Sequence, residues 1–405
     1  MSSTEIRSLA PRVINDVQAW MLYERADEDL YCVGNLERDK YIAVPAGKLP
    51  LVLNFVQLLD GTRSLESIAT TLEQEYGQKT DVVQLYQLLS HANLIEDPAP
   101  ESVFQGEFRR FSFDLLTLNT RRFFEKLQPF ARQTNRALWA VGLVVVLLGI
   151  ASLDAQFLSS QNVFLVGDSF LIGYAVLAAG SLLSILCHEL AHAFVASAYG
   201  ATARSIRMAL YMGFIPYFYT EIAGIYPLKP AQRIRIWLAG SYLNLLLGCA
   251  GILLYRWAGP FLTLEARQIL TKFSLANFFT ILGNLSPLMP TDGYFIVSTL
   301  LKRVNIRTNA LFEFLKWLRR EQNRLRGWIL VYFLLTSSII VGWLLMQLYW
   351  VAGIAVELLG GRWNLAALQP QFYFLIFVGV VLVRLLGVIF LKLLKNPPKR
   401  GNARP

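Results

Sequence analysis

Residues 181–200 read SLLSILCHELAHAFVASAYG, inside an apolar run (170–199) long enough to cross a bilayer. His188 and His192 are two of only three histidines in the chain. Residues four apart on a helix lie on one face, so both imidazoles can hold one zinc ion. Glu189 is placed to accept a proton from a water molecule that such a metal activates. The sequence therefore predicts a metal site at membrane depth.

The composition is typical of an integral membrane protein. The chain has 405 residues, of which 55% are hydrophobic and 16% are charged, whereas soluble domains carry about 25% charged residues. We attribute the net charge of +10 to lysines and arginines flanking membrane spans, and expect no nucleic-acid partner. The N-terminus lacks a basic segment followed by an apolar stretch, so no cleavable signal peptide is expected. The odd number of cysteines argues against a disulfide framework.

The apolar runs predict a polytopic α-helical membrane domain over residues 137–396 with about six transmembrane helices. The runs are 137–157, 170–199, 235–257, 268–289, 327–352 and 371–394. Basic residues gather in alternate connecting segments and in the tail 397–405, and the loop 156–169 has none. This pattern predicts a multi-pass protein with both termini in the cytoplasm, as in a bacterial inner membrane. Arg384, inside the sixth run, should face the bundle or a lipid headgroup.

Residues 1–105 predict a small cytosolic α+β domain of winged-helix-like form. Strands are expected at 30–33 and 41–44, followed by a helix over 49–59 and by helices that Ser64 and Asp81 begin. The stretch 58–65 (LLDGTRSL), with Ile68, Leu72, Leu88-Leu89 and Leu94-Ile95, resembles the PqqD-like peptide-recognition domain. That resemblance implies capture of a leader peptide by strand addition. A cytosolic cap without a ligand is the alternative.

Residues 106–136 are rich in arginine and phenylalanine. We expect them to form an amphipathic linker helix on the inner membrane surface.

A third metal ligand is predicted in residues 284–293, NLSPLMPTDG. Zinc protease sites commonly use three protein ligands plus water, and Asp292 supplies a carboxylate. The prolines break the helix at a depth where a substrate backbone could pair with the freed groups. The basic-residue topology places Asp292 and the two histidines together in the cytoplasmic half of the membrane.

Residues 180–305 resemble the site-2-protease family of intramembrane zinc metalloproteases, in the branch of peptide zinc metalloproteases. The resemblance rests on the HExxH motif together with Asn284, Pro287, Asp292 and Gly293. It departs at Pro290, six residues after Asn284, where many relatives have proline at five. Further matching segments are 194–200, 216–221, 233–235, 238–240 and 292–296.

The resemblance implies a role for each residue of the motifs. His188, His192 and Asp292 would hold Zn²⁺, and Glu189 would act as general base and then as proton donor. Asn284 is a catalytic candidate that would hold the substrate backbone or the developing oxyanion; the alternative is a structural cap where the helix breaks. The segment 205–228 would form a strand-like, membrane-embedded loop that presents substrate. Glu221 within that loop is a second acid, expected by default to face water at the interface.

Together these features predict an intramembrane zinc metalloendopeptidase that cleaves a peptide or a membrane-anchored protein during peptide maturation or export. The expected partners are that substrate, membrane lipid, and a leader peptide or a peptide exporter. The alternative is a non-proteolytic, zinc-containing membrane component of a peptide secretion system. Three histidines are too few for a di-iron hydroxylase. A metal transporter should instead have ligands along a path through several spans.

Overall fold

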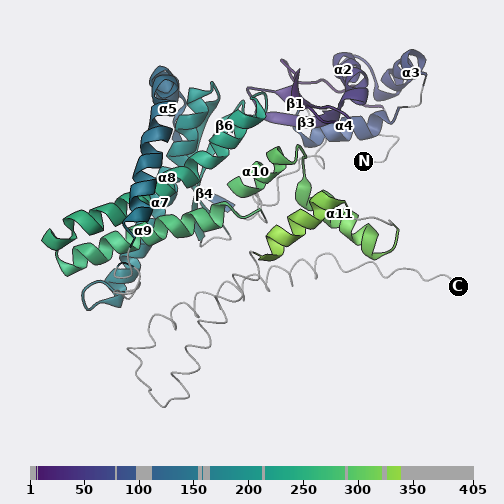
Figure 1. Ribbon diagram of the computed structural model, residues 1–405. Helices are drawn as coiled ribbons and strands as arrows, with labels where there is room; N and C mark the ends of the chain where they lie inside the picture. The colour runs from purple at the N-terminus through teal and green to yellow at the C-terminus, as the bar shows by residue number, and fades with distance from the viewer. Residues whose placement is uncertain are drawn as a thin grey trace.

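The computed structural model describes residues 6, 8–77, 80–96, 112–153, 157, 165–211, 215–287, 291–321 and 326–338. Figure 1 shows a helical bundle with an N-terminal unit of strands and helices beside one end of it. The sixth predicted span with Arg384, most of the fifth, and the tail 397–405 lie outside the described residues.

The N-terminal unit begins with an antiparallel sheet. Its strands are β1 (Gln18–Tyr23), β2 (Leu30–Asn35) and β3 (Lys40–Pro45), in the order β1-β2-β3. The strands predicted at 30–33 and 41–44 are confirmed as β2 and β3, and β1 adds a third that the sequence analysis did not anticipate.

Three helices follow this sheet: α2 (Leu49–Leu58), α3 (Leu65–Tyr76) and α4 (Val82–His91). Side chains at the predicted caps satisfy free backbone N–H groups, because Ser64 accepts from Ser67 and Asp81 accepts from Gln84. Sheet and helices share one core, whose most buried members include Val33, Phe55, Leu65, Ile68, Leu72 and Leu94. This is a small α+β unit, for which the winged-helix class remains a prediction.

Three helices are long and apolar enough to cross a membrane: Arg121–Ala151, Ile172–Ala198 and Pro230–Phe261. They correspond to α5 (Arg121–Ala151), α7 (Phe170–Ala198) and α8 (Pro230–Ala258) and overlap the first three predicted runs, although α5 also includes residues 121–136, which were predicted as part of the linker. On α5, side chains such as Val141, Val144 and Leu147 are more than half exposed. Such an outer face is suited to lipid.

Small residues let these helices approach closely. A Cβ added at Gly142 would lie 2.5 Å from the Tyr242 hydroxyl oxygen, and one at Gly149 would lie 2.4 Å from Cys249 Cβ. Both glycines are therefore packing points between α5 and α8, as is common between membrane helices.

The fourth helix of the bundle, α9 (Leu264–Asn284), packs against α7 and α8. It covers most of the fourth predicted run. Because Gln268, Lys272 and Asn277 are buried on it, α9 is less apolar than α5, α7 and α8. Its crossing of the membrane stays a prediction.

A second antiparallel sheet lies against the bundle. Its strands are β4 (Ser112–Asn119), β5 (Thr202–Tyr211) and β6 (Ile215–Ala223), in the order β4-β5-β6. Strands β5 and β6 confirm the non-helical, strand-like character predicted for the segment after 205. The expected linker helix is wrong for 112–119, because this stretch pairs with β5 over Ser205–Tyr211. Helix α5 begins only at Arg121.

After the bundle come α10 (Asp292–Leu300) and α11 (Ile306–Leu318). A further apolar helix, Gly327–Ser338, packs with them through Ile306, Ala310, Ile329 and Tyr332. Helix α10 lies against α8, which brings Asp292 to the bundle.

Candidate metal centre

The three predicted ligands meet in the structure. His188 and His192 lie one turn apart on α7, and Asp292 is the first residue of α10. Asp292 Oδ2 lies 2.8 Å from His188 Nε2 and 3.2 Å from His192 Nε2. The candidate ligand atoms all lie within 4.8 Å of one another. All three side chains are largely buried, at 1%, 4% and 9% exposure respectively.

The Nδ1 atoms of both histidines, which face away from Asp292, lie within hydrogen-bonding distance of oxygen atoms of α8. His188 Nδ1 lies 2.5 Å from Asn244 Oδ1, and His192 Nδ1 lies 2.6 Å from the Ile236 carbonyl oxygen. A carbonyl oxygen only accepts, so in each neutral imidazole Nδ1 carries the proton and Nε2 presents a lone pair. Ligand histidines are oriented in this way in many metal sites.

This donor set fits a divalent cation. Two imidazole lone pairs and a carboxylate oxygen face one another, and three acceptors in a buried space need a cation or a proton among them. His192 Nε2 is buried and lies 3.2 Å from Asp292 Oδ2. The spacings to Asp292 are near the roughly 3.3 Å between ligand atoms of a tetrahedral zinc site. His188, His192 and Asp292 could therefore hold a metal ion.

Two glycines allow the three helices to approach this closely. A Cβ at Gly240 of α8 would lie 2.4 Å from His188 Nε2, so only glycine leaves room for the ring. A Cβ at Gly293 would lie 2.1 Å from the Leu285 carbonyl oxygen. Gly293 therefore lets α10 begin directly against the end of α9, which positions Asp292.

A buried hydrogen-bond network supports Asn244. Its Nδ2 atom donates to Ser184 Oγ and to Asn277 Oδ1, both at 2.8 Å. Ser184 in turn donates to Asn277 Oδ1 at 3.0 Å, and Asn277 donates to the Phe273 carbonyl. Because every neighbour of Asn244 Nδ2 accepts, the amide oxygen must face His188. The network thus connects α7, α8 and α9 behind the first ligand.

Glu189 is half-buried beside the ligands. It is close enough to both histidines and to Asp292 to interact with them electrostatically. Its backbone carbonyl accepts a hydrogen bond of 3.1 Å from Thr220 Oγ1. Strand β6, which carries Thr220, therefore lies directly next to the motif.

Asn284 is the last residue of α9, and its Nδ2 donates to the Thr280 carbonyl at 3.2 Å. This contact agrees with the structural alternative at a helix end. The catalytic role predicted for Asn284 stays a prediction.

Glu221 belongs to an ion-pair cluster on the second sheet. Its carboxylate accepts from Arg207 at 2.9 Å and from Ser205 at 3.0 Å. Arg207 also contacts Asp114 of β4 at 3.0 Å, and Tyr219 donates to the same carboxylate. The cluster therefore ties the three strands together, and Glu221 has partners beyond the interfacial water expected for it.

The sequence analysis missed Asn244, Ser184 and Asn277. Each is a polar residue within an apolar helix, where polar groups need partners. The free-energy cost of an unpaired polar group in such a helix could have marked these residues in the sequence. Only the packing of α8 identifies His188 as the partner of Asn244.

No protein-family model matches the chain, and no similar curated protein or solved structure was found. The described residues define a protein with three helices long and apolar enough to cross a membrane and with a buried His-His-Asp group that could hold a metal ion.

Proposed function

We propose that the chain is an intramembrane zinc metalloendopeptidase that hydrolyses a peptide bond in a peptide or a membrane-anchored protein. One observation carries the proposal: His188, His192 and Asp292 converge beside Glu189 on elements of the helical bundle. Two histidines and one carboxylate form the donor set of a hydrolytic zinc site, and an adjacent glutamate can serve as its general base.

The chain's own residues would divide the chemistry. Zinc, when bound by His188, His192 and Asp292, would polarise both a water molecule and the substrate carbonyl. Glu189 would accept the proton of the attacking water and deliver it to the leaving amine nitrogen. Asn244 and the Ile236 carbonyl would keep both imidazoles oriented throughout.

Strand β6 supports the presentation of an extended substrate. Among the described strands it pairs only with β5, so its second edge has no strand partner. Thr220 of β6 contacts the backbone of Glu189. A peptide that added to this edge would pass next to the metal ligands, and its backbone groups would find partners inside the membrane.

A more specific form of this proposal is that the peptidase acts in peptide maturation or export, and that the N-terminal unit recruits a leader peptide. Strand β3 is an edge strand of the β1-β2-β3 sheet, a geometry that permits strand addition.

The test compares the wild-type protein with Glu189→Gln, both purified in detergent. We expect Glu189→Gln to abolish cleavage of a susceptible transmembrane peptide while leaving zinc content near one per chain. Glu265→Gln is the matched control, because Glu265 is an exposed acid at the start of α9, and it should keep full activity. Full activity of Glu189→Gln would remove Glu189 from the mechanism.

The same experiment addresses the alternative function. Bound zinc without turnover of any peptide, including peptides encoded beside the protein, would favour a non-proteolytic component of a secretion system.

A further inference from the structure

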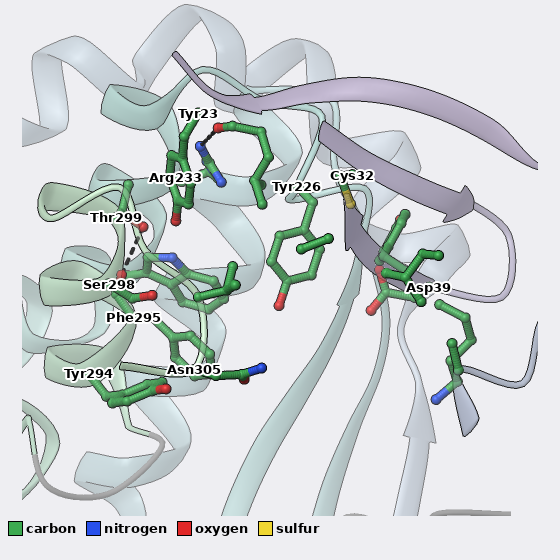
Figure 2. Close-up of a pocket in the computed structure, with 18 of the residues that line it drawn as sticks. Tyr23, Cys32, Asp39, Tyr226, Arg233, Tyr294, Phe295, Ser298, Thr299 and Asn305 are labelled. Atoms are coloured by element: carbon green, nitrogen blue, oxygen red, sulfur yellow. Dashed lines mark hydrogen bonds between the residues drawn. The ribbon is translucent and has the colours of Figure 1, made fainter. Parts of the chain in front are cut away.

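A cavity lies between the N-terminal unit and the bundle. It has a volume of about 370 Å³, and β2, β3, α8 and α10 contribute to its walls. Figure 2 shows its side chains converging from the two parts of the molecule. Six aromatic side chains line it together with polar and charged groups: Tyr23, Tyr41, Tyr226, Trp237, Tyr294 and Phe295.

Arg233 is the buried charge of this cavity. Its exposure is 2%, and it lies in the first turn of α8. One terminal nitrogen donates to the Leu22 carbonyl at 2.6 Å, and the guanidinium carbon lies 4.6 Å from the centre of the Tyr23 ring. Nε has no hydrogen-bond partner, and no carboxylate lies within 4.0 Å of the guanidinium, among the described residues.

A buried guanidinium without an anion is costly, since desolvation of a charge is repaid only by a close opposite charge and well-placed hydrogen bonds. The carbonyl and the aromatic ring offset part of that cost for Arg233. A negatively charged group in the cavity would offset the remaining desolvation cost of Arg233. The planar guanidinium can donate two parallel hydrogen bonds to the oxygens of a carboxylate.

The opposite wall presents buried polar atoms of Asp39 and Tyr41, whose side chains interact with each other. Figure 2 places Tyr226 between Arg233 and Asp39, and Tyr226 interacts electrostatically with both. A ligand that spans the cavity would therefore meet a cation at one end and acceptors at the other.

We propose that this cavity binds the carboxylate of an acyl-amino-acid group, with the carboxylate on Arg233 and an N–H group toward Asp39 and Tyr41. One buried cation matches the single negative charge of a carboxylate better than the double charge of a phosphate. The aromatic walls suit the apolar part of the ligand. The group could belong to a peptide or to a free acylated amino acid, because both present the same chemistry.

The cavity shares a wall with the metal centre. Trp237 and Phe295 stack at 4.8 Å between ring centres. Trp237 follows Ile236, whose carbonyl fixes His192, and Phe295 lies in the same helix as Asp292. The cavity is thus a site distinct from the ligands, yet attached to the two helices that position them.

The experiment measures binding to the full-length Glu189→Gln protein in detergent by isothermal titration calorimetry. The probes are the α-amide of N-acetyl-glutamate, which has one carboxylate, the uncharged α-amide of N-acetyl-glutamine, inorganic phosphate, and a short C-terminally amidated peptide containing one glutamate. We expect the α-amide of N-acetyl-glutamate to bind at least tenfold more tightly than the α-amide of N-acetyl-glutamine, because only the former carries a carboxylate. This comparison needs no variant at the site, and it does not depend on peptidase activity, so failure of the proposed function would leave it interpretable.

Variants then locate the site. Arg233→Gln should remove the tenfold preference for the acid over the amide. Arg235→Gln should retain it, because Arg235 lies on the same helix but is exposed and contacts Tyr199 instead. Tighter binding of the peptide would identify a peptide as the source of the carboxylate, and weaker binding of the peptide would identify a free acylated amino acid.

Three results would overturn the proposal. They are equal affinity for the acid and the amide, a preference for phosphate over both, and an acid preference that survives in a folded Arg233→Gln protein.

Discussion

Asn244 Oδ1 lies 2.5 Å from His188 Nδ1, on the side of the ring opposite Asp292. Its amide nitrogen donates to Ser184 and Asn277, so the side chain cannot turn without leaving buried acceptors unpaired. Asn244 therefore sets the tautomer of His188 and presents Nε2 to the metal position.

Replacing Asn244 by alanine should lower the affinity for zinc about 10- to 100-fold, the usual effect of removing a partner of a ligand histidine. Competition with a chromogenic chelator measures this affinity directly. Asn309→Ala is the control, because Asn309 is exposed on α11 and donates only to the Val304 carbonyl. Unchanged zinc affinity in a folded Asn244→Ala protein would contradict the positioning role.

A methyl group at Gly240 should displace His188. The added Cβ would lie 2.4 Å from the ring, and the backbone of α8 has to move to relieve the clash. We expect Gly240→Ala to bind zinc at least tenfold more weakly and to melt at a lower temperature, since overpacking typically costs about 1–3 kcal/mol.

Gly283→Ala provides the matched control for that substitution. Gly283 also lies in a helix, but an added Cβ there meets no atom within 4 Å. Alanine should therefore stabilise the helix by up to about 1 kcal/mol and leave zinc binding unchanged. Equal effects of the two substitutions would indicate a general response of the helices and not contact with His188.

Removal of the metal should lower stability only when Asp292 is intact. A ligand that binds only the folded state stabilises it by about 2.7 kcal/mol at one hundred times its dissociation constant. We expect a chelator to lower the melting temperature of the wild-type protein and to leave that of Asp292→Asn unchanged. Scanning fluorimetry in detergent, followed by restoration with Zn²⁺, measures both; a chelator effect of equal size in the variant would exclude Asp292 as a ligand.

Periodicity and motif spacing predicted the parts of this molecule that depend on local sequence. The helices begun by Ser64 and Asp81 follow from capping chemistry, and the first three apolar runs follow from their length. The meeting of His188 with Asp292 could also be predicted, because a buried histidine pair needs a further ligand and few acids lie in the apolar runs.

Pairings between distant segments were not accessible in the same way. Ser112–Asn119 carries no local signal that separates it from an amphipathic helix, and it becomes a strand because β5 offers a partner. The contact of Asn244 with His188 depends on the rotation of α8 about its axis, which Gly240 and Gly142 fix through close packing. The burial of Arg233 likewise depends on how the N-terminal sheet packs against α8.

Asp39 should lower the stability of the protein at neutral pH. Burial raises the pKa of its carboxyl above the usual value of 3.8, with Tyr41 and nearby cations opposing part of that effect. Because the folded state holds this proton more tightly, its contribution to stability is fully present below pH 3.8 and is lost as the pH rises through the raised pKa. Asp39→Asn should therefore melt at a higher temperature than wild type at pH 7, and the difference should shrink toward pH 4.

Asp27→Asn is the control with the opposite sign, since Arg25 lowers the pKa of the exposed Asp27 carboxyl, and loss of that pair should not stabilise the protein. Melting curves of the three proteins between pH 4 and 8 decide the matter, and a lower melting temperature for Asp39→Asn at pH 7 would show that the carboxylate has a stabilising partner in the folded protein.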